Sequence, residues 1–128
     1  MRCILKRSII LLVLLLLPTL LWAEDYFQPI PMSEVARLRN RPDVVVFDAN
    51  VHELWVEHSI PGAVHIDSRD IAGFLPADKN TILIFYCAGP QSRESAIAAN
   101  AAIILGFRRV FVMTDGIFTW LQAGYPVE

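Results

Sequence analysis

Cys87 is the residue of this chain whose type and setting point most directly to chemistry. It follows the apolar run 81–86 and precedes a short loop of small and polar residues, Ala88, Gly89, Pro90, Gln91, Ser92 and Arg93. An alanine-rich segment after this loop predicts a helix. The loop N–H groups and the positive end of that helix both favour an anion at the sulfur. We therefore expect a reactive thiolate, although a lone cysteine after a buried strand is more often an inert core residue.

Residues 1–23 have the layout of a secretory signal peptide. Three basic residues precede the apolar stretch 9–17, and Ala23 stands before the acidic pair Glu24-Asp25, which makes Ala23 the expected last residue of the leader. The apolar stretch is short for a membrane-spanning helix of roughly 20 residues, but an uncleaved anchor is the alternative. We expect an exported protein, periplasmic or secreted, with no membrane contact after cleavage.

Residues 24–128 are expected to form one domain, since this is a common length for a single hydrophobic core. All 13 acidic residues of the chain belong to it, whereas Arg2, Lys6 and Arg7 belong to the leader. The domain is therefore more acidic than the full chain, whose formal net charge is −2, and this excludes nucleic acid as the expected partner. Of the two cysteines of the chain, Cys3 lies in the leader, so Cys87 is the single cysteine of the domain. Exported proteins usually pair their cysteines in disulfides, so an unpaired one stands out.

The domain alternates strand and helix patterns, which predicts an α/β fold with a central parallel sheet flanked by helices. The apolar runs predict strands at 44–47, 63–66, 81–86 and 110–112. The intervening segments predict helices at 33–39, 53–58, 94–105 and 117–122, and a further short helix that reaches Phe74. Ser33 is expected to cap the first helix and Asp67 or Ser68 the short one. Gly106 is expected to end the helix at 94–105.

Several short motifs in order resemble the single-domain rhodaneses. They are Val46-Phe47-Asp48, the segment from Ile60-Pro61-Gly62 to Ile66, Tyr86-Cys87, Leu105-Gly106-Phe107, Asp115-Gly116 through Trp120, and Ala123-Gly124-Tyr125-Pro126. The resemblance implies a rhodanese-like domain over 24–128 that transfers sulfur without a cofactor or a metal. Cys87 would take sulfane sulfur from a donor such as thiosulfate, hold it as a persulfide and pass it to a thiol or cyanide. Ala88, Gly89, Gln91, Ser92 and Arg93 would bind the donor.

The loop departs from the family's common pattern, because Arg93 lies six rather than five places after Cys87. This spacing matches the cysteine, five residues, arginine signature of cysteine phosphatases and of some arsenate reductases that share the rhodanese fold. Tyr86 in place of their histidine and Glu94 in place of their serine or threonine argue against that activity. A carboxylate beside an oxyanion site repels a dianion. A non-catalytic binding module is the third alternative.

The other polar and aromatic residues have simpler interpretations. His52, His58 and His65 do not show metal-ligand spacing, so surface or hydrogen-bonding roles are expected. The pair Arg108-Arg109 follows a helix end and is expected to be solvated. Trp55 and Trp120 are expected to pack in the core or at its rim. Asp48-Ala49-Asn50 is expected to have a structural role. Ser92 is expected to be either a hydroxyl donor in the loop or a helix cap.

Overall fold

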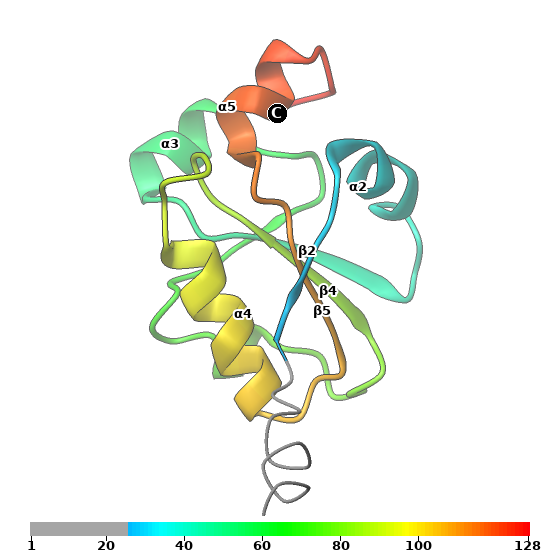
Figure 1. Ribbon diagram of the computed structural model, residues 1–128. Helices are drawn as coiled ribbons and strands as arrows, with labels where there is room; N and C mark the ends of the chain where they lie inside the picture. Colours follow the sequence, from blue (N-terminus) through cyan, green and yellow to red (C-terminus); the bar gives the residue numbers. More distant parts are fainter. Residues whose placement is uncertain (1–25) are drawn as a thin grey trace, which may run out of the picture.

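The computed structural model describes residues 26–128, so the predicted signal peptide lies outside the described residues. Five parallel strands form one sheet in the order β1-β5-β4-β2-β3 (Figure 1). The strands are β1 (Gln28–Pro29), β2 (Val44–Asp48), β3 (Val64–His65), β4 (Ile82–Tyr86) and β5 (Arg109–Val112). The predicted parallel α/β fold is confirmed.

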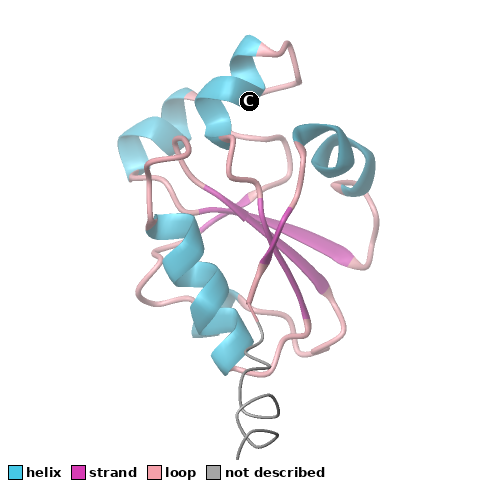
Figure 2. Cartoon of the chain, in the orientation of Figure 1, coloured by secondary structure: helices cyan, strands magenta, loops and turns pink. Residues whose placement is uncertain are grey.

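Helices cover both faces of the sheet, with α4 on one side and α2 and α5 on the other (Figures 1 and 2). The helical elements are α2 (Met32–Leu38), α3 (His52–Glu57), the 3-10 helix η1 (Ala72–Phe74), α4 (Glu94–Ile104) and α5 (Gly116–Gln122). Within residues 26–128, none of the helices has the length and apolar character needed to cross a membrane.

The central strands β2 and β4 separate two hydrophobic cores, because successive side chains of a strand point to opposite faces. Phe47 and Phe85 point toward α4 and stack with ring centroids 5.0 Å apart. Val46 and Ile84 point toward α2 and α5. Both faces are therefore buried, which is why these two segments are continuous apolar runs rather than alternating ones.

The structure corrects two predicted helix starts. Helix α2 begins after Pro31, whose carbonyl accepts hydrogen bonds from Glu34 and Val35, so Ser33 lies inside the helix and does not cap it. Asp67 accepts a hydrogen bond from the Arg69 N–H, and this local turn competes with helix formation. The short helix before Phe74 therefore begins only at Ala72, and neither Asp67 nor Ser68 caps it.

Candidate functional site

Cys87 follows the carboxyl end of β4, near the middle of the sheet. Its side chain is 3% exposed and packs in the hydrophobic cluster that includes Ala98 and Ala99 of α4. The Cys87 Sγ lies 2.9 Å from the hydroxyl oxygen of Ser95, which is also buried. A hydrogen bond from this hydroxyl stabilises a thiolate more than a thiol, because bonds to charged acceptors are stronger.

Ser95 was missed by the sequence prediction, which considered Ser92 as the hydroxyl of the site. The Ser92 N–H donates to the Gly89 carbonyl at 3.1 Å and closes a turn within the loop. Ser95 lies in the first turn of α4 and shares the buried face of that helix with Ala98, Ala99 and Ala102. This spacing of i, i+3, i+4 and i+7 is visible in the sequence and could have identified Ser95 as the polar member of a buried helix face.

The loop between Cys87 and α4 offers several free backbone donors. Within residues 26–128, the N–H groups of Ala88, Gly89 and Gln91 have no hydrogen-bond acceptor, and Pro90 has no N–H at all. Free N–H groups next to the first turn of a helix favour an anionic ligand. The predicted loop residues are thus adjacent to Cys87, as the chain order requires, and several of their donors remain available.

Arg93 and Glu94 form the junction between the loop and α4. Arg93 is the N-cap residue of the helix, and its backbone N–H donates to a carboxylate oxygen of Glu94 at 3.1 Å. Both side chains are exposed, and within the described residues the Arg93 guanidinium has no hydrogen-bond or ion-pair partner. The Glu94 carboxylate therefore occupies one donor that an anionic substrate would otherwise use.

The first residues of α5 hold the cysteine loop from the other side. The Ile117 N–H donates to the Cys87 carbonyl at 2.9 Å, and the Phe118 N–H donates to the Ala88 carbonyl at 3.3 Å. Gly116 has φ +76°, and a Cβ at this position would lie 2.3 Å from the Ala88 oxygen and 2.5 Å from the Gly89 Cα. Only glycine permits this approach of the two segments.

Asp48 and Tyr86 are neighbours on β2 and β4 in the layer that faces α5. The Tyr86 hydroxyl accepts a hydrogen bond from the Ile60 N–H at 3.0 Å, and one Asp48 carboxylate oxygen accepts from the Asn50 N–H at 2.8 Å. Burial raises the pKa of Asp48 above its usual value. Burial, followed by the nearby Asp48 carboxylate, strongly raises the pKa of Tyr86. Tyr86 therefore remains a neutral phenol and supports the segment that contains Ile60.

The histidines and tryptophans occupy the positions expected for packing and hydrogen bonding. Within the described residues there is no group of three or more side chains suited to hold a metal ion. His65 Nε2 lies 2.7 Å from the Asn50 carbonyl, and the His65 ring stacks on Trp55 at 5.0 Å. Trp120 is fully buried, as predicted, and its indole N–H donates to the Pro126 carbonyl at 2.8 Å.

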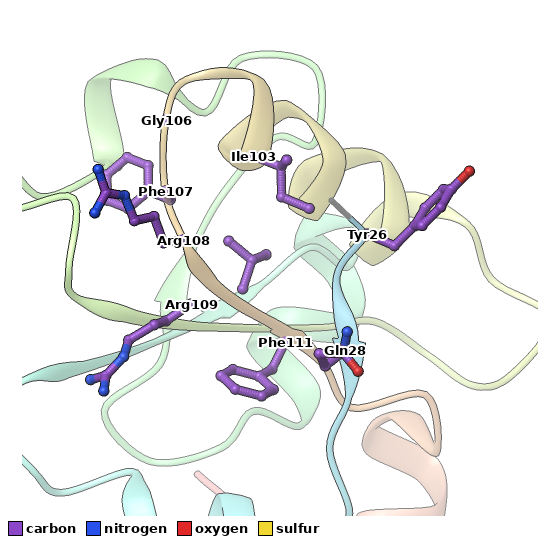
Figure 3. A pocket seen from close by; sticks show the side chains of 9 residues that line it. Tyr26, Gln28, Ile103, Gly106, Phe107, Arg108, Arg109 and Phe111 are labelled. Carbon is purple, nitrogen blue, oxygen red and sulfur yellow. The ribbon is translucent and has the colours of Figure 1, made fainter. Parts of the chain in front are cut away.

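Two cavities lie at opposite edges of the sheet. One, of about 590 Å³, lies at the carboxyl ends of β2 and β3 and is also lined by Glu94, the first residue of α4. The other, of about 710 Å³, lies at the start of β5 and the end of α4. Figure 3 shows Arg108 and Arg109 on one side of it and Tyr26 pointing away from them on the other. Arg108 and Arg109 are exposed, as predicted.

The fold and the loop together define a parallel α/β domain with a buried cysteine at the carboxyl edge of its central strand. The chain belongs to the rhodanese-like domain family, whose sequence profile matches residues 31–123.

Thiosulfate sulfurtransferase GlpE from Pseudomonas putida strain F1 is 30% identical to this chain over 103 residues, which cover 80% of this chain and 91% of the relative. The family therefore includes relatives that are named for thiosulfate sulfur transfer. A thiosulfate sulfurtransferase from Pseudomonas aeruginosa has a TM-score of 0.70 at 20% identity, over 82% of this chain and 20% of that one. A Rhodopseudomonas palustris protein described as a possible tyrosine phosphatase has a TM-score of 0.67 at 24% identity, over 80% and 85% of the two chains. At these identities the two structures show a shared fold.

Proposed function

We propose that this protein is a sulfurtransferase or sulfane-sulfur carrier that works through a Cys87 persulfide. The Cys87 thiolate attacks the outer sulfur of thiosulfate, a new S–S bond forms, and sulfite leaves with the electron pair of the broken bond. The persulfide then passes its outer sulfur to a thiol or to cyanide. No cofactor enters this reaction. The observation that carries the proposal is the Cys87 sulfur 2.9 Å from the Ser95 hydroxyl, at the base of a loop with free N–H donors.

The electrostatics of the loop fit the two anions of this reaction. The N–H groups of Ala88, Gly89 and Gln91 are available for the sulfonate end of thiosulfate and later for the terminal sulfur of the persulfide. Arg93, whose guanidinium has no partner among the described residues, provides a cation for the same sulfonate. Since Cys87 is only 3% exposed, a slim sulfur atom reaches it more readily than a bulky substrate.

Treatment of the protein with thiosulfate followed by intact-mass analysis tests this function. We expect the mass of one added sulfur atom, lost on addition of cyanide and absent from the Cys87→Ser variant. A protein that keeps its unmodified mass under these conditions, while still binding a partner, would instead be a binding module of the same fold.

The second candidate is a cysteine-dependent phosphatase or arsenate reductase, and it rests on the spacing of Cys87 and Arg93. In such an enzyme Arg93 would clamp a tetrahedral oxyanion with two hydrogen bonds. The Glu94 carboxylate, bonded to the Arg93 N–H, opposes a dianionic phosphate at this position. Sulfur transfer is therefore the preferred function.

Variants at these two positions distinguish the candidates. For a sulfurtransferase, we expect Arg93→Ala to lower kcat/KM for thiosulfate about ten- to a hundredfold, since a hydrogen bond to a charged group contributes roughly 1.5–3 kcal/mol. Glu94→Gln should modestly raise it, because a repelling charge is removed. Cys87-dependent release of phosphate from an aryl phosphate, at a rate above that of sulfur transfer, would favour the phosphatase.

We also propose that the protein acts outside the cytoplasm, on the basis of the leader-like residues 1–23. N-terminal sequencing of the exported protein should then begin at Glu24. A chain that still begins with Met1 would indicate a retained anchor.

A further inference from the structure

The cavity at the carboxyl ends of β2 and β3 has walls built from four parts of the chain. Residues 49–52 follow β2, residues 65–70 end and follow β3, Phe74 ends η1, and Glu94 begins α4. Ala49 and Ile66 line the cavity and also belong to the hydrophobic cluster that contains Cys87. The Ala49 N–H donates to the carbonyl of Tyr86, the residue before Cys87, at 2.9 Å. Cys87 does not itself line the cavity, but Glu94 does, and Glu94 precedes Ser95, whose hydroxyl lies 2.9 Å from the Cys87 sulfur. The cavity therefore borders the residues that surround the proposed persulfide.

Two largely buried polar residues, Asn50 and Ser68, line this cavity. Asn50 is 7% exposed, and its buried side-chain amide lies beside the buried Asp48 carboxylate. Ser68 is 9% exposed, and its hydroxyl has no hydrogen-bond partner in the part of the chain that the structure describes. In a residue that is this buried, a hydroxyl without a protein partner can be satisfied by a ligand in the cavity.

The charged residues around the cavity favour a cation. Asp67, Asp70 and Glu94 line it, whereas the only lysine or arginine among its lining residues is Arg69. Arg69 lies 3.8 Å from Asp67, and within residues 26–128 neither Asp70 nor Glu94 forms an ion pair. Carboxylates without counter-ions attract an ammonium group and repel the thiosulfate dianion.

We propose that this cavity binds the sulfur acceptor and that the acceptor is a small thiol carrying an ammonium group. This inference rests on the proposed sulfurtransferase function and specifies its second substrate. The carboxylates and the Ser68 oxygen accept hydrogen bonds from the ammonium. The donor anion is held by the loop N–H groups, so donor and acceptor bind at separate places.

The transfer step balances without a further reactant. The acceptor thiol loses its proton to solvent, and its thiolate attacks the outer sulfur of the Cys87 persulfide. A new S–S bond forms on the acceptor, the bond between the Cys87 sulfur and the outer sulfur breaks, and its electron pair stays on Cys87. Cys87 is thereby returned as the thiolate that reacts with the next donor.

Two thiols of equal length and opposite charge test the acceptor preference, 2-aminoethanethiol and 2-mercaptoethanesulfonate. Each is reacted with protein that carries the Cys87 persulfide, and the loss of the added sulfur is followed by mass. The ratio of the two rate constants is compared between wild type, Asp70→Asn and the control Asp78→Asn. Asp78 is exposed and precedes the amino end of β4, whereas the cavity lies at the carboxyl ends of the strands. Asparagine at position 78 can still accept the hydrogen bond from the Asn80 N–H.

We expect Asp70→Asn to lower the ratio of the amine rate to the sulfonate rate about three- to fivefold, the effect of one partly screened charge. Asp78→Asn should leave the ratio unchanged. Comparing ratios cancels the different intrinsic reactivities of the two thiols. A ratio that is the same in wild type and Asp70→Asn overturns the acceptor assignment while leaving the persulfide itself intact.

A binding measurement separates this inference from the proposed function. The unreactive thioether 2-(methylthio)ethylamine is titrated into the reduced protein and followed by amide NMR shifts. Saturable shifts at residues 50–52 and 66–70, weakened by Asp70→Asn and by Ser68→Ala, support the site even in a protein that forms no persulfide. Shifts that are absent from these residues refute the site.

Discussion

Replacement of Gly116 by alanine should damage both the stability and the activity of the protein. An alanine at φ +76° costs about 1–2 kcal/mol, the usual penalty for a left-handed backbone with a side chain. The new Cβ would also lie 2.5 Å from the Gly89 Cα, where carbon atoms normally keep about 3.5 Å. The cysteine loop must therefore move by about 1 Å.

This displacement strains the two hydrogen bonds that Ile117 and Phe118 donate to the loop carbonyls, each worth about 1 kcal/mol. With the backbone penalty, we expect Gly116→Ala to lower the free energy of unfolding by about 3–4 kcal/mol. A domain of this size has roughly 5–15 kcal/mol, so the variant should still fold. A shift of about 1 Å at the reacting group costs about a hundredfold in rate.

Gly124→Ala provides the matched control. Gly124 has φ +84°, and a Cβ there would meet no atom within 4 Å. This variant should lose only the backbone penalty of about 1–2 kcal/mol and keep its activity. Urea unfolding gives the free energies, and thiosulfate to cyanide transfer, measured on folded protein, gives the rates. Equal losses of stability and activity in both variants would show that the close approach of α5 does not position the loop.

Three further predictions follow from individual side chains. Cys87→Ser should abolish sulfur transfer with little loss of stability, since a hydroxyl is a poor nucleophile at neutral pH; transfer at the wild-type rate would make the thiol structural. Ser95→Ala should lower the transfer rate about ten- to a hundredfold, the value of a hydrogen bond to a charged sulfur, and an unchanged rate would contradict its role. Burial raises the pKa of Asp48 in the folded state above the value near 3.8 that it has in the unfolded chain. The free energy of unfolding therefore falls as the pH rises above about 3.8. Asp48→Asn should therefore exceed wild type in urea midpoint at pH 7, and this advantage should vanish below about pH 3.8.

The central strands and the long helix could be predicted from the sequence because their patterns report burial directly. The run Val44-Val45-Val46-Phe47 and the run before Cys87 are apolar on both faces, and Gly106, at φ +99°, follows the end of α4. Strand β1 left no such signal. It has two exposed residues, one of them a proline, and pairs with β5 only because the tertiary fold brings the two segments together.

The candidate site was predicted in part for the same reason. Cys87 and its loop are contiguous in the chain, so local sequence identifies them. Ser95 had a readable signal on the buried face of α4, but the contact with sulfur depends on how that helix packs. The role of Gly116 requires the approach of two segments more than 25 residues apart, and no local pattern encodes that distance. Ser33 failed as a cap because the Pro31 carbonyl already accepts the first helical hydrogen bonds.

The two hydrophobic cores, rather than the loop's own sequence, determine where Cys87 lies. Its sulfur and Ser95 are held by the core beneath α4, whereas its carbonyl is held by α5 on the opposite face. Helix α5 is itself fixed by Ile117 and Trp120, both fully buried. Each end of the loop is therefore anchored independently, and Pro90 and Gln91 between them are exposed. The packing of both helices therefore sets the position of the sulfur, and the exposed middle of the loop does not determine it.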